Sequence, residues 1–303
     1  MWSWHRPLML FCAVMAALSV IFLPLVVLDP RTLDGLPIWV KPLKFAVSFA
    51  LYSFTWAWLL SLRHRAGRVS RWMGTLLVVT GTIEVVLITF QAARGRHSHF
   101  NVATPFDRAV FIAMGVTIGL LLVANLVAAI LVIVERQADR VGTWAVRLGL
   151  VVSSLGLASG SLMVTGVPGQ NWAENLAGAH TVGLPDGGPG LPLLGWSTVG
   201  GDLRVAHFVG MHALQLLPLL AMLLAALSAR WTALRDEDVR ARLVIVAGLA
   251  YGGLFLLVLW QALRGLPLIA PDALTLAALG ALAVATLGGV AAALRQKQDL
   301  TAR

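Results

Sequence analysis

A short polar stretch holds the densest group of side chains in this chain that could do chemistry. It runs from Gln91 to Asp107, reads QAARGRHSHFNVATPFD, and directly follows an apolar run. His97 and His99 lie two residues apart within it, so both imidazoles could bind one metal ion if the backbone there is extended. The alternative is that both are simple surface residues.

A carboxylate precedes this stretch on the same helical face. Glu84 lies seven residues before Gln91, which places it about 10 Å deeper along a helix axis. An ionisable residue at that depth in a membrane predicts a functional site, so Glu84 is the candidate catalytic or proton-accepting group. The structural alternative is a protonated glutamic acid that is hydrogen-bonded between helices.

A second group of basic and polar residues lies in GDLRVAHFVGMHALQ. His207 and His212 are five residues apart, so on a regular helix they point about 140° away from each other and cannot bind one metal ion together. Each needs a partner on another helix. Arg204 shares a face with His207, and Gln215 shares one with His212.

Lys41, Lys44, Ser48 and Tyr52 form a polar stripe on one side of an expected helix. Such a stripe lines either a contact between helices or a cavity. In a cavity, the lysines favour an anionic ligand group at the mouth; otherwise they extend to lipid headgroups. The expected substrate cavity takes its polar lining from both groups and the stripe: Lys41, Lys44, Ser48, Tyr52, Gln91, Asn101 and Gln215.

Apolar helices must position all of these residues. Hydrophobic residues make up 58% of the chain and charged residues 12%, with a mean hydropathy of +0.83. Runs of about 20 apolar residues predict membrane spans. The first run is too long for the apolar core of a signal peptide and lacks a cleavage motif, so we interpret it as a span. The sequence therefore predicts an all-α polytopic membrane protein with eight spans, at 7–28, 38–62, 73–92, 109–134, 144–166, 204–228, 243–264 and 272–294.

Charge sets the expected orientation. The net charge of +9 would favour nucleic acid in a soluble protein, but most basic residues lie in short loops on the side of both termini. This is the positive-inside pattern, which excludes nucleic acid as the expected partner and leaves the lipid bilayer, with a small-molecule or cofactor ligand also open. We expect a bacterial-type cytoplasmic membrane with both termini in the cytoplasm. Cys12 is the single cysteine, which excludes an intramolecular disulfide.

Eight basic residues break this pattern and need another reason for their position. They cluster at the outer ends of the spans: Arg31, Lys41, Lys44, Arg94, Arg96, Arg108, Arg204 and Arg264. The long outer loop, 167–203, is rich in Gly and Pro. Its irregular backbone either covers the mouth of the bundle or is a plain flexible connector.

The two halves of the chain resemble each other. Span three ends in QAARG and span seven in QALRG, and a Pro-Asp signal follows each. Lys41-x-x-Lys44-Phe45 also lines up with Arg204-x-x-His207-Phe208. We therefore expect two tandem four-helix repeats, 1–142 and 143–303, related by a parallel pseudo-two-fold axis along the membrane normal. The alternative is chance alignment of apolar helices.

The repeated and the unrepeated residues have different expected roles. Asp107 and Asp272 are predicted helix caps, with chemistry as the alternative, and the glycine of each QAxRG is a predicted C-cap. A site is needed only once, so the unrepeated residues are the better candidates. A composite site between the halves would combine Glu84, His97 and His99 with His207 and His212.

Histidines near outer helix ends suit axial ligation of haem b, with arginines beside the propionates. In outline the chain resembles the heme A synthase family, through its eight spans, its four-plus-four duplication and the QALxG-like endings of spans three and seven. The resemblance implies a haem-ligating role for His207. The chain departs from that family because spans four and eight contain no histidine and the outer-loop cysteine pair is missing. Neither standard haem site is complete, and the hydroxylation activity is not implied.

Three functions fit these residues. The first is a haem-binding or redox protein, in which His207 or His212 faces His97 or His99 and the arginines Arg94, Arg96 and Arg204 lie nearby. The second is a transporter or permease, with Glu84 as the proton-coupling group. The third is a structural or sensory membrane protein without turnover.

Overall fold

The computed structural model describes residues 4–62, 67–135 and 139–295, and within these ranges eight helical spans are long and apolar enough to cross a membrane. In chain order the helices are α1 (Arg6–Leu28), α2 (Val40–Ser61), α3 (Arg68–Ala93), α4 (Pro105–Ile133), α5 (Arg140–Ser159), the short α6 (Leu162–Thr165), α7 (Leu203–Leu227), α8 (Glu237–Leu263) and α9 (Ala273–Arg295). A short 3₁₀ helix, η1 (Thr232–Arg235), precedes α8.

All eight predicted spans are confirmed as helices, and they agree with the prediction to within a few residues at most ends. The fifth span is divided, since α5 ends at Ser159 and α6 completes it to Thr165. Large apolar side chains on the outer faces, such as Leu10, Val27 and Leu219, are exposed. Helices of this kind imply contact with a lipid bilayer.

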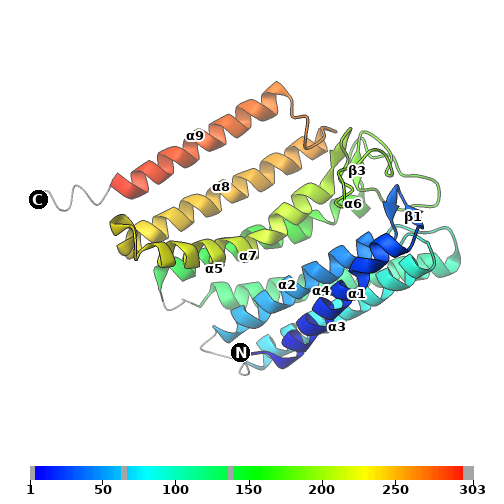
Figure 1. Cartoon of the computed structure of the whole chain (residues 1–303), viewed down its shortest axis with the longest axis horizontal. Coiled ribbons are helices and arrows are strands. Elements are labelled where there is room, and N and C mark those ends of the chain that lie inside the picture. Colours follow the sequence, from blue (N-terminus) through cyan, green and yellow to red (C-terminus); the bar gives the residue numbers. More distant parts are fainter. Residues whose placement is uncertain (1–3, 63–66, 136–138, 296–303) are drawn as a thin grey trace, which may run out of the picture.

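The helices form two groups that lie side by side (Figure 1). Helices α1 to α4 pack together, and α5, α7, α8 and α9 form the second group. Contacts of α4 with α5 and of α2 with α7 join the groups. Helix α9 lies at the far edge against α8, and most of its surface is exposed.

The tightest helix crossing, between α5 and α7, uses glycine. Gly156 and Gly210 face each other there, and a Cβ atom on Gly210 would lie 2.5 Å from the Cα atom of Gly156. Small residues let membrane helices approach closely where the hydrophobic effect cannot hold them together. This crossing fixes the position of the first turns of α7, which carry Arg204 and His207.

The two ends of the bundle differ. The end that carries Arg6 and Arg295, called here the terminal end, has short connections (Figure 1). The opposite end, called the loop end, carries two small antiparallel strand pairs, β1 (Thr32–Leu33) with β2 (Leu36–Pro37) and β3 (Thr181–Val182) with β4 (Gly201–Asp202). The polar and ionisable residues that were predicted to form a site gather at the loop end.

Candidate functional site

A buried carboxylate and a histidine form the centre of the site. Glu84 on α3 is 0% exposed, and its Oε1 atom lies 3.0 Å from Nε2 of His99. The segment that follows α3 therefore folds back into the bundle, where the His99 ring also packs against Phe45. Neither Oε1 nor Oε2 of Glu84 has a hydrogen-bond partner among the described residues, so the approach of His99 is close but lacks hydrogen-bond geometry.

The contacts of His99 fit a neutral imidazole. Burial lowers the pKa of His99, as does the charge of Lys41, and the opposing effect of Glu84 does not restore it. The hydroxyl of Ser98 lies 3.2 Å from Nδ1, so a proton on Nε2 can face Glu84 while Nδ1 accepts from Ser98. The pair thus combines the buried carboxyl group of Glu84 with the imidazole of His99, a base that becomes charged when it takes up a proton.

Lys41 brings an unpaired cation to this pair. Its side chain is half-buried at the start of α2, and within the described residues it makes no hydrogen bond or ion pair. Its charge acts on both His99 and His180, so it lies within electrostatic range of each. A cation that is removed from water without an anionic partner is costly, which makes Lys41 a candidate contact for an anionic ligand.

Two further histidines pair with aspartates above this centre. Nε2 of His97 lies 2.9 Å from Oδ2 of Asp34, and Nδ1 of His180 lies 2.6 Å from Oδ2 of Asp186. Asp186 also accepts hydrogen bonds from the backbone N–H of His180 and from Thr181. One pair thus joins the β1–β2 turn to the segment after α3, and the other lies within the 166–202 loop.

These pairs have shifted pKa values. Burial, helped by the charges of Arg204 and Lys41, lowers the pKa of His180 to about 4 although Asp186 opposes this. Burial alone would raise the pKa of Asp186, but the contacts of His180 and Thr181 outweigh it and hold this pKa well below its usual range. At neutral pH the pair is a neutral imidazole beside a carboxylate.

His207 points one ring nitrogen at the helix crossing. Its Nδ1 atom lies 2.8 Å from the carbonyl oxygen of Gly156 on α5, so Nδ1–H donates and Nε2 is left as an acceptor. His207 is close enough to His99 and His212 for their charges to act on it. His212 stacks on Phe208, 6.5 Å between ring centres. The half-buried Gln215 carries an Oε1 atom without a partner among the described residues.

The loop of residues 166–202, called here the covering loop, lies over the ends of the helices. Its residues Asn175 and Ala177 make backbone hydrogen bonds to the segment 100–102. Nζ of Lys44 donates to the carbonyl oxygen of Leu194 at 2.9 Å, and Nη2 of Arg204 donates to that of Gly195 at 2.6 Å. Of the two interpretations of this loop, the covering one is correct.

Several predicted site residues hold the architecture instead. Asp107 accepts from Gln91 at 3.0 Å and from Arg94 at 2.8 Å, and Thr104 caps α4. The backbone N–H of Asp107 is the group that Thr104 caps, so the N-cap is Thr104 and not Asp107, which instead joins the ends of α3 and α4 through its side chain. Arg94, expected beside a cofactor, binds this carboxylate and lies over the Phe106 ring.

Four other predicted residues have local roles or make no side-chain hydrogen bond to a described residue. The hydroxyl of Tyr52 donates to Asn125 at 2.8 Å, which places it in a contact between helices and not in the expected cavity. Asn101 is buried and bonds the backbone of His97 and Ala103. Arg96 is exposed and Ser48 is half-buried.

Sequence reasoning missed the acidic side of the site. Asp34, Asp186 and Asp202 all lie in segments at the loop end, and none was expected to take part. Asp202 is buried and binds Arg204 through both of its oxygens. A search for outer acids to match the unexpected outer cations would have found all three.

The donors do not suit a metal ion or a haem with two imidazole ligands. The described residues contain no group of three or more His, Cys, Asp or Glu side chains that could hold a metal. His97 and His99 were expected to have no carboxylate nearby, but each faces its own, so they do not converge on one point. His207 keeps one imidazole nitrogen available, and α4 and α9 supply no histidine opposite it.

No model of a known protein family, no curated protein and no solved structure matches the chain. The chemistry of the loop-end residues is therefore the basis on which a function is assigned.

Proposed function

We propose that this integral membrane protein binds a small anion beside Lys41 at the loop end, and couples the passage of that anion to a proton held by Glu84 and His99. The observation that carries the proposal is the unpaired Lys41 ammonium next to the buried Glu84–His99 contact. We assign the loop end to the outer face of a bacterial-type cytoplasmic membrane, because most basic residues lie at the terminal end.

The coupling follows from the short distances between these charges. An anion beside Lys41 would lie within electrostatic range of His99, because the charge of Lys41 already acts on that ring. Negative charge raises the proton affinity of a neighbouring acid or base. Linkage is reciprocal, so a bound proton strengthens binding of the anion by the same factor. This arrangement favours joint movement of an anion and a proton.

The duplication and the family resemblance support the same framework. Gly95 and Gly265 both have positive φ, of 66° and 74°, after matching QAxRG endings. Arg94 binds Asp107, and Arg264 binds Asp272, so both endings are held in the same way. We propose that 1–142 and 143–303 are tandem repeats with parallel orientation, as the resemblance to the heme A synthase family implies, and that the anion site lies between them.

Reconstituted proteoliposomes test this function. With a pH-sensitive dye inside, inward gradients of chloride, phosphate or lactate should acidify the lumen for the anion that is transported. Lys41→Met should abolish the signal, whereas Glu84→Gln should remove the proton movement and leave the protein folded. Arg71→Gln, an exposed change at the terminal end, is the matched control.

Two results would change the assignment. If an anion raises the unfolding temperature but none is transported, the protein is a sensor of that anion. If no anion raises the unfolding temperature and none is transported, the proposed site is wrong. The same holds if Lys41→Met transports as well as wild type.

A haem-binding function is tested separately. The observation in its favour is the hydrogen bond from His207 to Gly156, because histidine ligands commonly donate their second ring N–H to a carbonyl. Protein expressed with ample haem should then show a Soret band that His207→Ala removes. A spectrum without that band excludes haem.

A further inference from the structure

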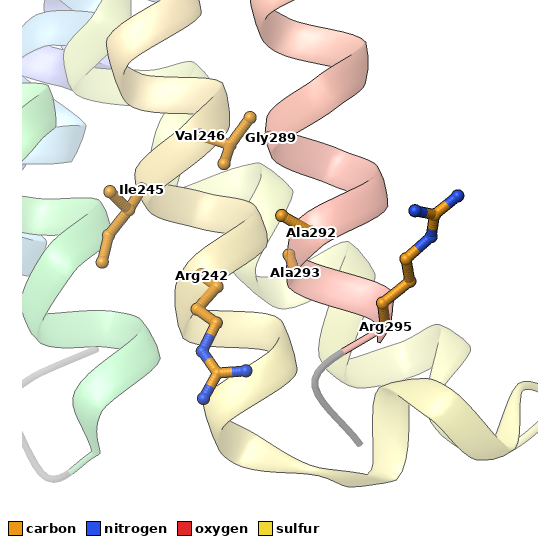
Figure 2. Close-up of a pocket in the computed structure, with 7 residues that line it drawn as sticks. All are labelled: Arg242, Ile245, Val246, Gly289, Ala292, Ala293 and Arg295. Atoms are coloured by element: carbon orange, nitrogen blue, oxygen red, sulfur yellow. The ribbon is translucent and has the colours of Figure 1, made fainter. Parts of the chain in front are cut away.

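Two grooves lie on either side of the contact between α8 and α9 at the terminal end. The first, of about 490 Å³, lies between Arg242, Val246, Gly289 and Ala293 (Figure 2). The second, of about 560 Å³, is lined by Arg230, Trp231, Leu243 and Val290. Both have apolar floors and basic residues at the rim. They are remote from the loop-end site.

The cations at the rim of the first groove lack anionic partners. Arg242 extends from α8 and Arg295 from the last turn of α9, and their guanidinium groups point in different directions, that of Arg295 away from α8 (Figure 2). Neither makes an ion pair or side-chain hydrogen bond with any described residue. Nearby Arg140, in contrast, is paired with Asp238. The rim of the first groove therefore carries two long cationic side chains that are unpaired among the described residues.

The shape of the groove depends on small residues of α9. A Cβ atom on Gly289 would lie 3.0 Å from a methyl group of Val246, so glycine allows α9 to approach α8 there. Ala292, one turn of helix nearer the end, is exposed. The remaining space is open towards the bilayer, because most of α9 is exposed. Acyl chains, and not water, are the medium that meets this surface.

We propose that this first groove binds one anionic phospholipid from the leaflet at the terminal end. The phosphate group would bind Arg242, and the exposed side chain of Arg295 would turn towards it, while an acyl chain would follow the floor beside Val246 and Ala293. Charge complementarity supports this occupant, because basic pockets between membrane helices bind anionic headgroups and guanidinium matches phosphate oxygens. Trp231, 61% exposed at the rim of the second groove, marks the headgroup level on the same side.

Native mass spectrometry of the full chain tests the site, with phosphatidylglycerol as the probe and phosphatidylcholine as the neutral comparison. Phosphatidylglycerol should bind more tightly to wild type, and each of Arg242→Gln and Arg295→Gln should weaken it about fivefold. The double variant Arg68→Gln with Arg71→Gln removes the same charge from the first half at the same end. This control should bind phosphatidylglycerol like wild type.

A second variant probes the floor without changing charge. Ala292→Trp should fill the groove and weaken phosphatidylglycerol binding while both arginines remain. Equal binding by wild type and both arginine variants would overturn the proposal. Displacement of the lipid by millimolar inorganic phosphate would also overturn it, because the site would then be one for the free anion. A changed oligomeric state in the arginine variants would overturn it too, because the groove would then be a subunit interface. None of these results depends on the anion proposed at the loop end.

Discussion

Gly156 and Gly210 meet backbone to backbone at the crossing of α5 and α7, and no side chain fits between them. The carbonyl group of Gly156 is also the acceptor for His207. One close approach therefore both joins the two helices and orients an imidazole of the candidate site.

Substitution of Gly210 by alanine should weaken this crossing. The added methyl group has no room, so we expect a loss of about 1–3 kcal/mol in the free energy of unfolding. Thermal unfolding in detergent would measure it. Gly119→Ala on α4 is the control, because a Cβ there meets nothing within 4 Å; that variant should be as stable as wild type or slightly more so. A stable Gly210→Ala protein would contradict the close crossing.

The His180–Asp186 pair predicts lower stability in mild acid. The folded pKa of His180 is about 4, below its usual value of 6.5. Between these values the unfolded chain binds a proton that the folded protein does not, so stability falls as pH drops from 6.5 to 4. The full effect is up to about 3 kcal/mol. His180→Asn should flatten this part of the curve of unfolding temperature against pH, and an unchanged slope would refute the assignment.

The aspartates at the starts of α4 and α9 should differ in their contribution to stability. Asp107 is 2% exposed and accepts from Gln91, Arg94 and Thr104, so Asp107→Ala should cost about 2 kcal/mol. Asp272, 36% exposed, accepts from Arg264 and from the backbone N–H of Thr275, and water can reach its carboxylate. Asp272→Ala should therefore lower the unfolding temperature less. Equal losses would show that burial does not distinguish the two aspartates.

The covering loop should open more often without its cationic contacts. Lys44→Met removes one charge-assisted hydrogen bond to Leu194, worth about 1.5 kcal/mol, which predicts about tenfold faster proteolysis within the covering loop. Arg108→Gln, at an exposed position of the same end, should leave the rate unchanged. Cleavage of Lys44→Met at the wild-type rate would mean that the loop is held by other contacts.

Features that depend on neighbouring residues were predictable from the sequence. The spans follow from the apolar runs, and the predicted C-cap glycine Gly95 has the positive φ that this position needs, whereas the predicted cap at Asp107 is three residues late because Thr104 caps α4. Arg94 was assigned to a cofactor only because it is a basic residue at the end of the bundle where few are expected. In the structure its guanidinium pairs with the nearby carboxylate of Asp107.

Features that depend on the order of helices in space were not predictable. Lys44 and Arg204 stood out together as unexpected basic residues, but hydropathy does not say that α7 lies beside α2, so their contacts with adjacent peptide groups were not predictable. Asp34 and His97 are 63 residues apart and meet only because two outer turns lie together. Glu84 was expected near a polar cluster, but its contact with His99 required a loop that folds inward.

Two basic residues from different halves of the chain donate hydrogen bonds to neighbouring peptide groups of the covering loop. Lys44 holds the carbonyl of Leu194, and Arg204 holds that of Gly195. Adjacent Cα atoms are about 3.8 Å apart and cannot stretch. If the loop-end termini of α2 and α7 were separated by more than about an ångström, one of the two hydrogen bonds would break, since a hydrogen bond weakens steeply with distance. The two contacts therefore tie the start of α2 to the start of α7 through one pair of adjacent peptide groups.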